Sequence, residues 1–195
     1  MERDDLFTMT HKGLRHGLFS VAQQAGTTEY GDPGAFAALR ATWSRLERLL
    51  RAHSRQEDEH VLPLVSSKIP GGAVDLAREH TEIRAALDGL AAQVTTIGEE
   101  AEVEERRVLG LGFYRAVQRL LVTVLPHLDD EETVLMPRLR ATCSEEEIAR
   151  VRAGLSNALG PEETQHLFGL MLQAVNPVER EALLDRVPGT GGREG

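Results

Sequence analysis

The sequence predicts an all-α protein: an up-down-up-down four-helix bundle followed by a C-terminal extension of short helices. Two observations support this fold class. Leu, Ala, Glu and Arg dominate the chain of 195 residues, and aromatic residues make up only 4% of it, a composition that favours helices over sheets. Apolar residues also recur at helical spacing along four long stretches, which short polar or glycine-rich segments separate.

The first two helices are expected at residues 4 to 25 and 33 to 66. Gly26 ends the first, and the polar loop "GTTEYGDPG" follows it. In that loop Asp32 is a suitable N-cap, and Pro33 suits the first turn of the next helix. The second helix carries an apolar stripe of Leu39, Trp43, Leu46, Leu49 and Leu50.

The third and fourth helices are expected at about 73 to 97 and 104 to 141. The segment "PGG" at 70 to 72 breaks the chain before the third, and the acidic stretch "GEEAEVEE" leads into the fourth. The connections are short, so neighbouring helices should be antiparallel. The larger aromatic residues are expected in the core: Trp43, Phe19, Phe113 and Tyr114.

The pattern changes after residue 142. "SEEE" at 144 to 147 is a capping box, and Gly160-Pro161 and Asn176-Pro177 each open a further short helix. We therefore divide the chain into a bundle at 1–142, a helical extension at 143–188 and a disordered tail at 189–195. The extension is not expected to fold independently of the bundle.

Charge and composition narrow the class of partner. The net charge of −9 argues against a nucleic-acid partner, since phosphate binding needs a basic surface. The single cysteine, Cys143, cannot form an internal disulfide and fits a reducing cytoplasm. The charged N-terminus lacks the apolar run of a signal peptide, and no stretch approaches the roughly 20 apolar residues that span a bilayer. We expect a cytoplasmic protein without membrane partners.

Two segments on the second and fourth predicted helices match each other. "HSRQEDEHVLP" (53 to 63) and "HLDDEETVLMP" (127 to 137) share a histidine, a glutamate four residues later, a second acid and a proline. Residues four apart lie on one helix face, so His53 with Glu57, and His127 with Glu131, can both point into the bundle. A buried ionised glutamate is very costly unless it is paired or binds a metal. Two such pairs facing each other predict a cation site.

The other two helices should each contribute a histidine. His80 lies on the apolar stripe of the third helix. The first helix offers His11 and His16, which face different directions; we favour His11 because it shares a face with Leu14 and Leu18. The predicted ligands are then four histidines and two carboxylates, namely His11, His53, Glu57, His80, His127 and Glu131. This mixture suits iron or manganese, and six ligands suit two ions with both glutamates bridging.

Several alternatives stay open. His60 lies two turns after His53 and could line the pocket or hydrogen-bond a ligand. The acids that follow the two ligand glutamates, Asp58 and Glu132, are either solvated or orient neighbouring charges. A different di-iron arrangement would use two Glu-x-x-His motifs, ending at His60 and at His166. His16 and His166 are otherwise expected on the surface.

The local segments "HKGLRHGLF", "HSRQEDEHVLPLV", "EHTEIRAALDGL" and "HLDDEETVLMPRL" resemble the hemerythrin-like, or HHE cation-binding, family over about residues 8 to 142. The resemblance implies a hemerythrin-like bundle in which the six predicted ligands hold a non-haem di-iron centre. The chain departs from the oxygen-carrying members at two positions. Arg84 stands where they have a second histidine, and Glu132 stands where they have an aspartate.

The resemblance and these departures together set the functional hypotheses. The first is a di-iron protein that binds or turns over dioxygen, peroxide or nitric oxide. If it turns the ligand over, it is expected to be an oxidoreductase. The second is a metal-dependent sensor or iron-storage module that acts through residues 143 to 188. The third is an oxidoreductase for an organic substrate, which would need an apolar cavity beside the metals. Manganese remains an alternative to iron, and the sequence indicates no protein partner.

Overall fold

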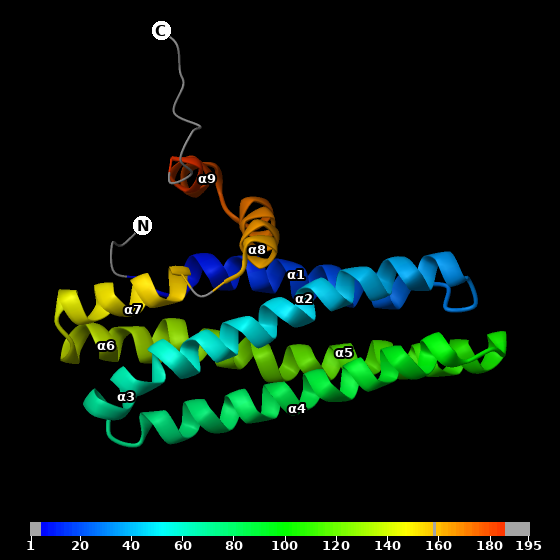
Figure 1. Ribbon diagram of the computed structural model, residues 1–195, viewed down its shortest axis with the longest axis horizontal. Helices are drawn as coiled ribbons and strands as arrows, with labels where there is room; N and C mark the ends of the chain where they lie inside the picture. The colour runs from blue at the N-terminus through cyan, green and yellow to red at the C-terminus, as the bar shows by residue number, and fades with distance from the viewer. Residues whose placement is uncertain (1–4, 158, 186–195) are drawn as a thin grey trace, which may run out of the picture.

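The computed structural model describes residues 5–157 and 159–185, and in these ranges all regular secondary structure is helical. Figure 1 shows four long helical segments side by side, with successive segments running in opposite directions. The all-α fold class predicted from the sequence is confirmed. The predicted disordered tail, residues 189–195, lies outside the described residues.

The first two long helices are α1 (Thr8–Thr27) and α2 (Pro33–His60). Helix α1 begins later than the sequence predicted, because the Asp5 carboxylate accepts hydrogen bonds from the amides of Phe7 and Thr8, both at 2.9 Å. The predicted cap of α2 is present: Asp32 accepts from the amides of Gly34 at 2.7 Å and Ala35 at 3.3 Å. Such a side-chain acceptor satisfies amides that have no partner within the helix.

The second and fourth predicted helices are each interrupted near their shared proline. After α2 the chain turns at Val61 and continues as α3 (Leu62–Lys68). Helix α4 (Gly72–Glu99) follows, and then α5 (Val103–Asp130) passes through a π-helical turn, η1 (Glu131–Leu135), into α6 (Met136–Thr142). The helical segments predicted at 33 to 66 and at about 104 to 141 are therefore present, each with a local irregularity that the sequence did not predict. A proline has no amide hydrogen and cannot continue the α-helical ladder.

Two clusters of buried apolar residues fill the bundle. The larger includes Leu14, Leu50, Ile83 and Val124, and the smaller includes Phe7, Val61, Leu76 and Met136. On each long segment, residues of the two clusters are separated by about two to three helical turns. The predicted histidines and glutamates fall within these gaps, so the helices bring them into one layer between two apolar regions.

The aromatic side chains follow the prediction in part. Trp43 and Phe113 are buried and meet edge to face, with ring centroids 5.9 Å apart. Tyr114 is partly buried against the larger cluster. The expectation for Phe19 was wrong, because its side chain is 54% exposed. It follows the buried Leu18 by one residue, which turns it about 100° away from the core.

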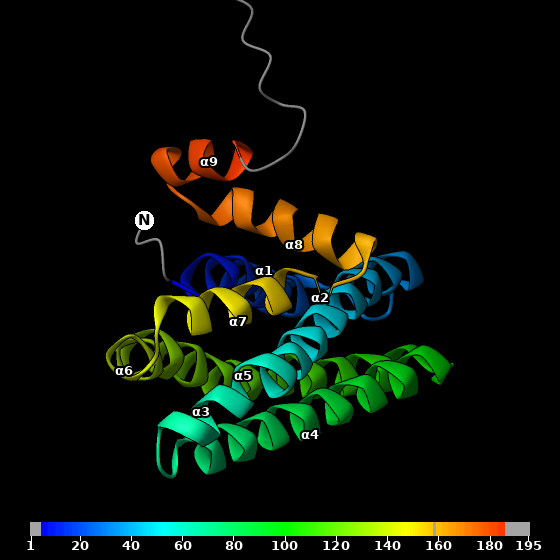
Figure 2. The same cartoon turned by 60° about the vertical axis from the view of Figure 1, so that its left-hand side comes forward.

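The extension consists of α7 (Glu145–Asn157), α8 (Pro161–Ala174) and α9 (Pro177–Leu184). The capping box at Ser144 and Glu147 is present, with bonds of 2.9 and 3.2 Å. Helix α7 packs on α2, and α8 packs on both α1 and α2 (Figure 2). The extension therefore covers one side of the bundle.

One helical stretch, Val103–Thr142, contains an 18-residue window apolar enough to cross a membrane by length and composition. The sequence pattern predicted no apolar run of this length. Its buried residues, such as Phe113 and Leu120, belong to the core of the bundle. Core helices commonly pass the same test, so the finding is weak evidence for a membrane span.

Candidate metal centre

The structure brings the six predicted ligand residues into one buried layer. His11 comes from α1, His53 and Glu57 from α2, His80 from α4, His127 from α5 and Glu131 from the π-helical turn. Each of these residues is at most 8% exposed. The layer lies between the two apolar clusters, so bulk water is largely kept from the polar side chains.

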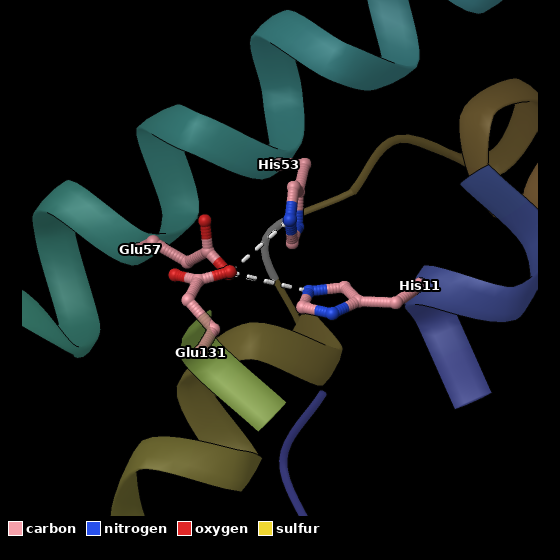
Figure 3. A group of neighbouring side chains, drawn as sticks. All are labelled: His11, His53, Glu57 and Glu131. Atoms are coloured by element: carbon pink, nitrogen blue, oxygen red, sulfur yellow. Dashed lines mark ion pairs between the residues drawn. The ribbon is translucent and has the colours of Figure 1, made fainter. Parts of the chain in front are cut away.

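The donor atoms of the six residues form two overlapping groups. In each group the donor atoms lie within 4.8 Å of one another. One group contains His11, His53, Glu57 and Glu131; Figure 3 shows these side chains pointing toward one another. The other contains His80 and His127 with the same two glutamates. Two histidines therefore stand at each end, and both carboxylates belong to both groups.

The inward-facing atoms of this layer are buried and lack hydrogen-bond partners among the described residues. They are the Nε2 atoms of His11, His53, His80 and His127 and both carboxylate oxygens of Glu57 and Glu131. The closest contacts, such as 3.2 Å between His53 Nε2 and Glu57 Oε1, are not hydrogen bonds. Buried polar atoms are normally paired, and leaving one unpaired costs about 1–3 kcal/mol. Eight such atoms facing one another fit the coordination of metal cations, which pair with lone pairs directly.

A second set of carboxylates holds the outer nitrogen of three of the four histidines. The pairs are Asp58 Oδ1 to His80 Nδ1 at 2.6 Å, Glu79 Oε2 to His127 Nδ1 at 3.0 Å, and Glu132 Oε1 to His11 Nδ1 at 2.9 Å. A proton on Nδ1 is then donated to the carboxylate, which leaves the lone pair of Nε2 available to the interior. This arrangement fixes ring orientation and tautomer in metal-binding histidines.

These three acids follow one rule. Each is adjacent in sequence to a predicted ligand on its own segment but bonds a histidine of a different helix. Glu79, for example, precedes His80 on α4 and bonds His127 of α5. The sequence analysis missed Glu79, although its position beside a predicted ligand was an available signal. For Asp58 and Glu132 it left two alternatives open, and the structure favours the orienting one.

Two arginines hold these outer acids in turn. Arg84 Nη1 lies 2.8 Å from Asp58 Oδ2, and Arg15 Nη1 lies 2.6 Å from Glu132 Oε1. Arg84 is a residue that distinguishes this chain from the pattern of the resemblance, which has a further histidine at this position. It contributes no atom to either ligand group. Instead, it fixes the carboxylate that orients His80.

Burial and crowding shift the pKa values of the layer in opposite directions. Burial raises the pKa of Glu131 well above its usual value, and the charge of nearby Glu57 adds to the effect. Burial opposes ionisation of Glu57 too, but the surrounding histidines outweigh it and lower its pKa. Burial lowers the pKa of His53 to about 3. Burial and the charge of Glu57 thus oppose ionisation of Glu131, whereas the histidines favour ionisation of Glu57. A bound cation would favour ionisation of both acids.

The remaining histidines lie elsewhere. His60 is half-buried against Gly154 of α7, and no described contact joins it to the six residues. His166 lies on α8 in a surface cleft that Arg48 also lines. The two Glu-x-x-His motifs are therefore not brought together at one site. His16 is half-buried and belongs to neither ligand group.

Comparison with known protein families confirms the predicted resemblance. The family model described as the hemerythrin HHE cation binding domain matches residues 3–139 of the chain. The match includes all six predicted ligands and the three outer acids. A search of curated proteins found no match. The matched region ends before α7, so the extension lies outside it.

Proposed function

The chain belongs to the hemerythrin HHE cation-binding family, and from this premise we propose that its buried histidines and glutamates hold two non-haem iron ions. We propose further that the centre binds or turns over a small ligand such as dioxygen, peroxide or nitric oxide. The observation that carries this proposal is the pair of overlapping ligand groups that share Glu57 and Glu131. Manganese is the alternative metal.

The shared carboxylates support two ions rather than one. All four oxygens of Glu57 and Glu131 are buried and unpaired, so each carboxylate can give one oxygen to each ion. With two imidazoles at each end, every ion would have about four protein ligands. Iron and manganese commonly take more than four ligands, which leaves positions for an exogenous molecule.

The types of donor support iron. Imidazole suits zinc, copper and iron, carboxylate suits harder ions, and the mixture of both is typical of non-haem iron. Cys143, the one cysteine of the chain, belongs to neither ligand group, so no thiolate favours a softer metal. When bound, iron would supply a Lewis acid that can also change oxidation state.

The residues of this chain would serve that chemistry in three ways. His11, His80 and His127 are held in orientation by their outer carboxylates, so little rearrangement is needed on binding. Glu57 and Glu131 bring negative charge to the middle of the layer. The apolar clusters on both sides exclude water, which strengthens electrostatic interactions inside.

Metal content and absorption test the proposal. The full-length chain would be loaded with ferrous iron without oxygen, desalted and analysed, and its spectrum recorded before and after peroxide. We expect about two irons per chain and near-ultraviolet bands that change with peroxide. A parallel sample loaded with manganese tests the alternative metal. Retention of neither metal, or iron without any spectral response to peroxide or nitric oxide, would contradict the proposed function.

A further inference from the structure

A cavity of about 400 Å³ lies between the bundle and the extension, on the α1–α2 side of the centre. His53 and Glu57, two of the predicted ligands, line it together with Gln56. The opposite wall comes from α7, α8 and α9. We call this cavity the chamber. It has the volume of a small-molecule site, and it reaches the centre from the side where the histidine lacks an outer acid.

The walls of the chamber are mainly apolar. Leu155 of α7 and Leu167, Phe168 and Met171 of α8 line it. All four belong to the extension, beyond the region that the family model matches. The matched domain therefore supplies the floor of the chamber, and the extension supplies this wall. An apolar wall facing a polar floor suits a molecule with an apolar body and one polar end.

The floor contains an unused hydrogen-bond donor. Gln56 is only 6% exposed, and its side-chain nitrogen is buried without a partner among the described residues. An unpaired buried amide is unfavourable, and a ligand with an acceptor oxygen would pair with it. Gln56 lines the same cavity as His53 and Glu57, so such an oxygen would lie near the metal centre.

The charges around the chamber favour a neutral ligand. While no metal is bound to it, the Glu57 carboxylate at the floor would repel an anion. Arg152 also lines the chamber, and it has an interaction with another group of the protein. The α8 residues that line the chamber are uncharged, so this wall does not attract a cation.

We propose that the chamber binds a neutral, largely apolar organic molecule with one carbonyl or hydroxyl oxygen. Gln56 orients the oxygen, and the apolar body lies against α7 and α8. This binding site goes beyond the proposed function, because it does not depend on which metal the centre holds. The extension would thereby provide a binding site for an organic molecule, next to the centre at which we propose that dioxygen, peroxide or nitric oxide binds.

The wall is held close enough to define a site. Helix α8 crosses α1 at Gly13 and Gly17, where an added Cβ atom would lie 2.9 Å from the Met171 side chain and 3.2 Å from the Leu170 side chain, respectively. At Gly13 it would also lie 3.2 Å from the backbone nitrogen of Met171, so a larger residue there would require α8 to shift. The two glycines, one turn apart, allow the close approach that encloses the chamber.

The test measures binding of 2-octanone, a neutral ketone, to the full-length protein freed of metal with a chelator, by calorimetry or saturation-transfer NMR. A portion of each sample is afterwards loaded with iron. Octanoate, of the same length but negatively charged, is the comparison ligand. We expect saturable binding of 2-octanone that is at least about tenfold tighter than that of octanoate. Loss of the Gln56 donor in Gln56→Leu should weaken binding of the ketone about tenfold.

A pair of tryptophan variants provides the matched control. Thr164 is exposed and lines the chamber, whereas the adjacent Gln165 is exposed and lines the surface cleft near Arg48 instead. Thr164→Trp should abolish binding of 2-octanone, and Gln165→Trp should leave it unchanged. Absence of saturable binding, equal binding by the two variants, or tighter binding of octanoate would overturn the proposal. Metal content is measured on the same samples, so failure of the centre and failure of the chamber are separate results.

Discussion

The two ends of the metal centre are held in different ways. At the α4–α5 end, both His80 and His127 have an outer nitrogen bonded to a carboxylate. At the α1–α2 end, His11 has such a bond, but no described side chain bonds the outer nitrogen of His53, and that residue faces the chamber. One end is thus oriented on both sides, and the other is open on one side. If the centre binds an exogenous molecule, this difference favours approach at the α1–α2 end.

The largest change in iron content should come from altering one of the two glutamates that both ends share. Glu57→Gln keeps the size of the side chain but removes the charge and one acceptor from both ligand groups. We expect iron content to fall from about two per chain to near zero. His53→Ala and His80→Ala each remove a ligand from one end only and should retain about one iron.

Glu59→Gln is the matched control, because Glu59 is exposed on the same helix and belongs to neither group. Its iron content should equal that of the unaltered chain. If both histidine variants lost all their iron, the two ends would form one indivisible site and the comparison would fail.

A smaller effect is expected from the outer acids. Glu79→Gln or Asp58→Asn removes the carboxylate that orients a histidine of the α4–α5 end but leaves every ligand in place. The affinity for iron should fall about 10- to 100-fold, measured by competition with a chelator. Arg84→Gln, which frees Asp58 from its 2.8 Å contact, should have a weaker effect in the same direction. Unchanged affinity in both acid variants would show that the outer bonds are incidental.

The smallest effect concerns acid stability of the metal-free protein. Burial lowers the pKa of His53 from 6.5 to about 3. Between pH 6.5 and 5 the unfolded chain therefore takes up a proton at this position and the folded chain does not. The free energy of unfolding should fall by about 2 kcal/mol over that interval because of His53 alone.

Denaturation of the unaltered chain and of His53→Asn in chelator, at pH 6.5 and pH 5, isolates this contribution. Glu57, whose pKa is lowered, stays ionised throughout the interval. The unaltered chain should lose about 2 kcal/mol more than the variant. Equal losses would mean that His53 is not buried as a neutral ring in the absence of metal.

The parts of the site that could be predicted from the sequence are those governed by helical spacing. A glutamate four residues after a histidine must share its helix face, so the pairs on α2 and α5 were predictable, as was His80 on an apolar stripe. The start of α2 at Asp32 followed from capping chemistry. These features depend on residues close together in the chain.

The parts that were missed depend on tertiary packing. Glu79 bonds a histidine 48 positions away, and such a partner follows only from how α4 and α5 are placed side by side. The π-helical turn at Glu131 and the break at Val61 lie next to prolines. A proline removes one backbone hydrogen bond of the helix, but its presence alone does not predict which irregularity results. The chamber needs α8 to dock on α1, and no local pattern in the sequence specifies that contact.

The position of the polar layer between two apolar clusters has a consequence for how the protein unfolds. Hydrophobic contacts within each cluster are continuous, but the layer of histidines and glutamates separates the two. Each of the two ligand groups takes residues from three of the four long segments, and Glu57 and Glu131 belong to both groups. Ions bound there would link the segments across the layer and couple the two clusters. Metal binding is then expected to make unfolding of the whole domain more cooperative.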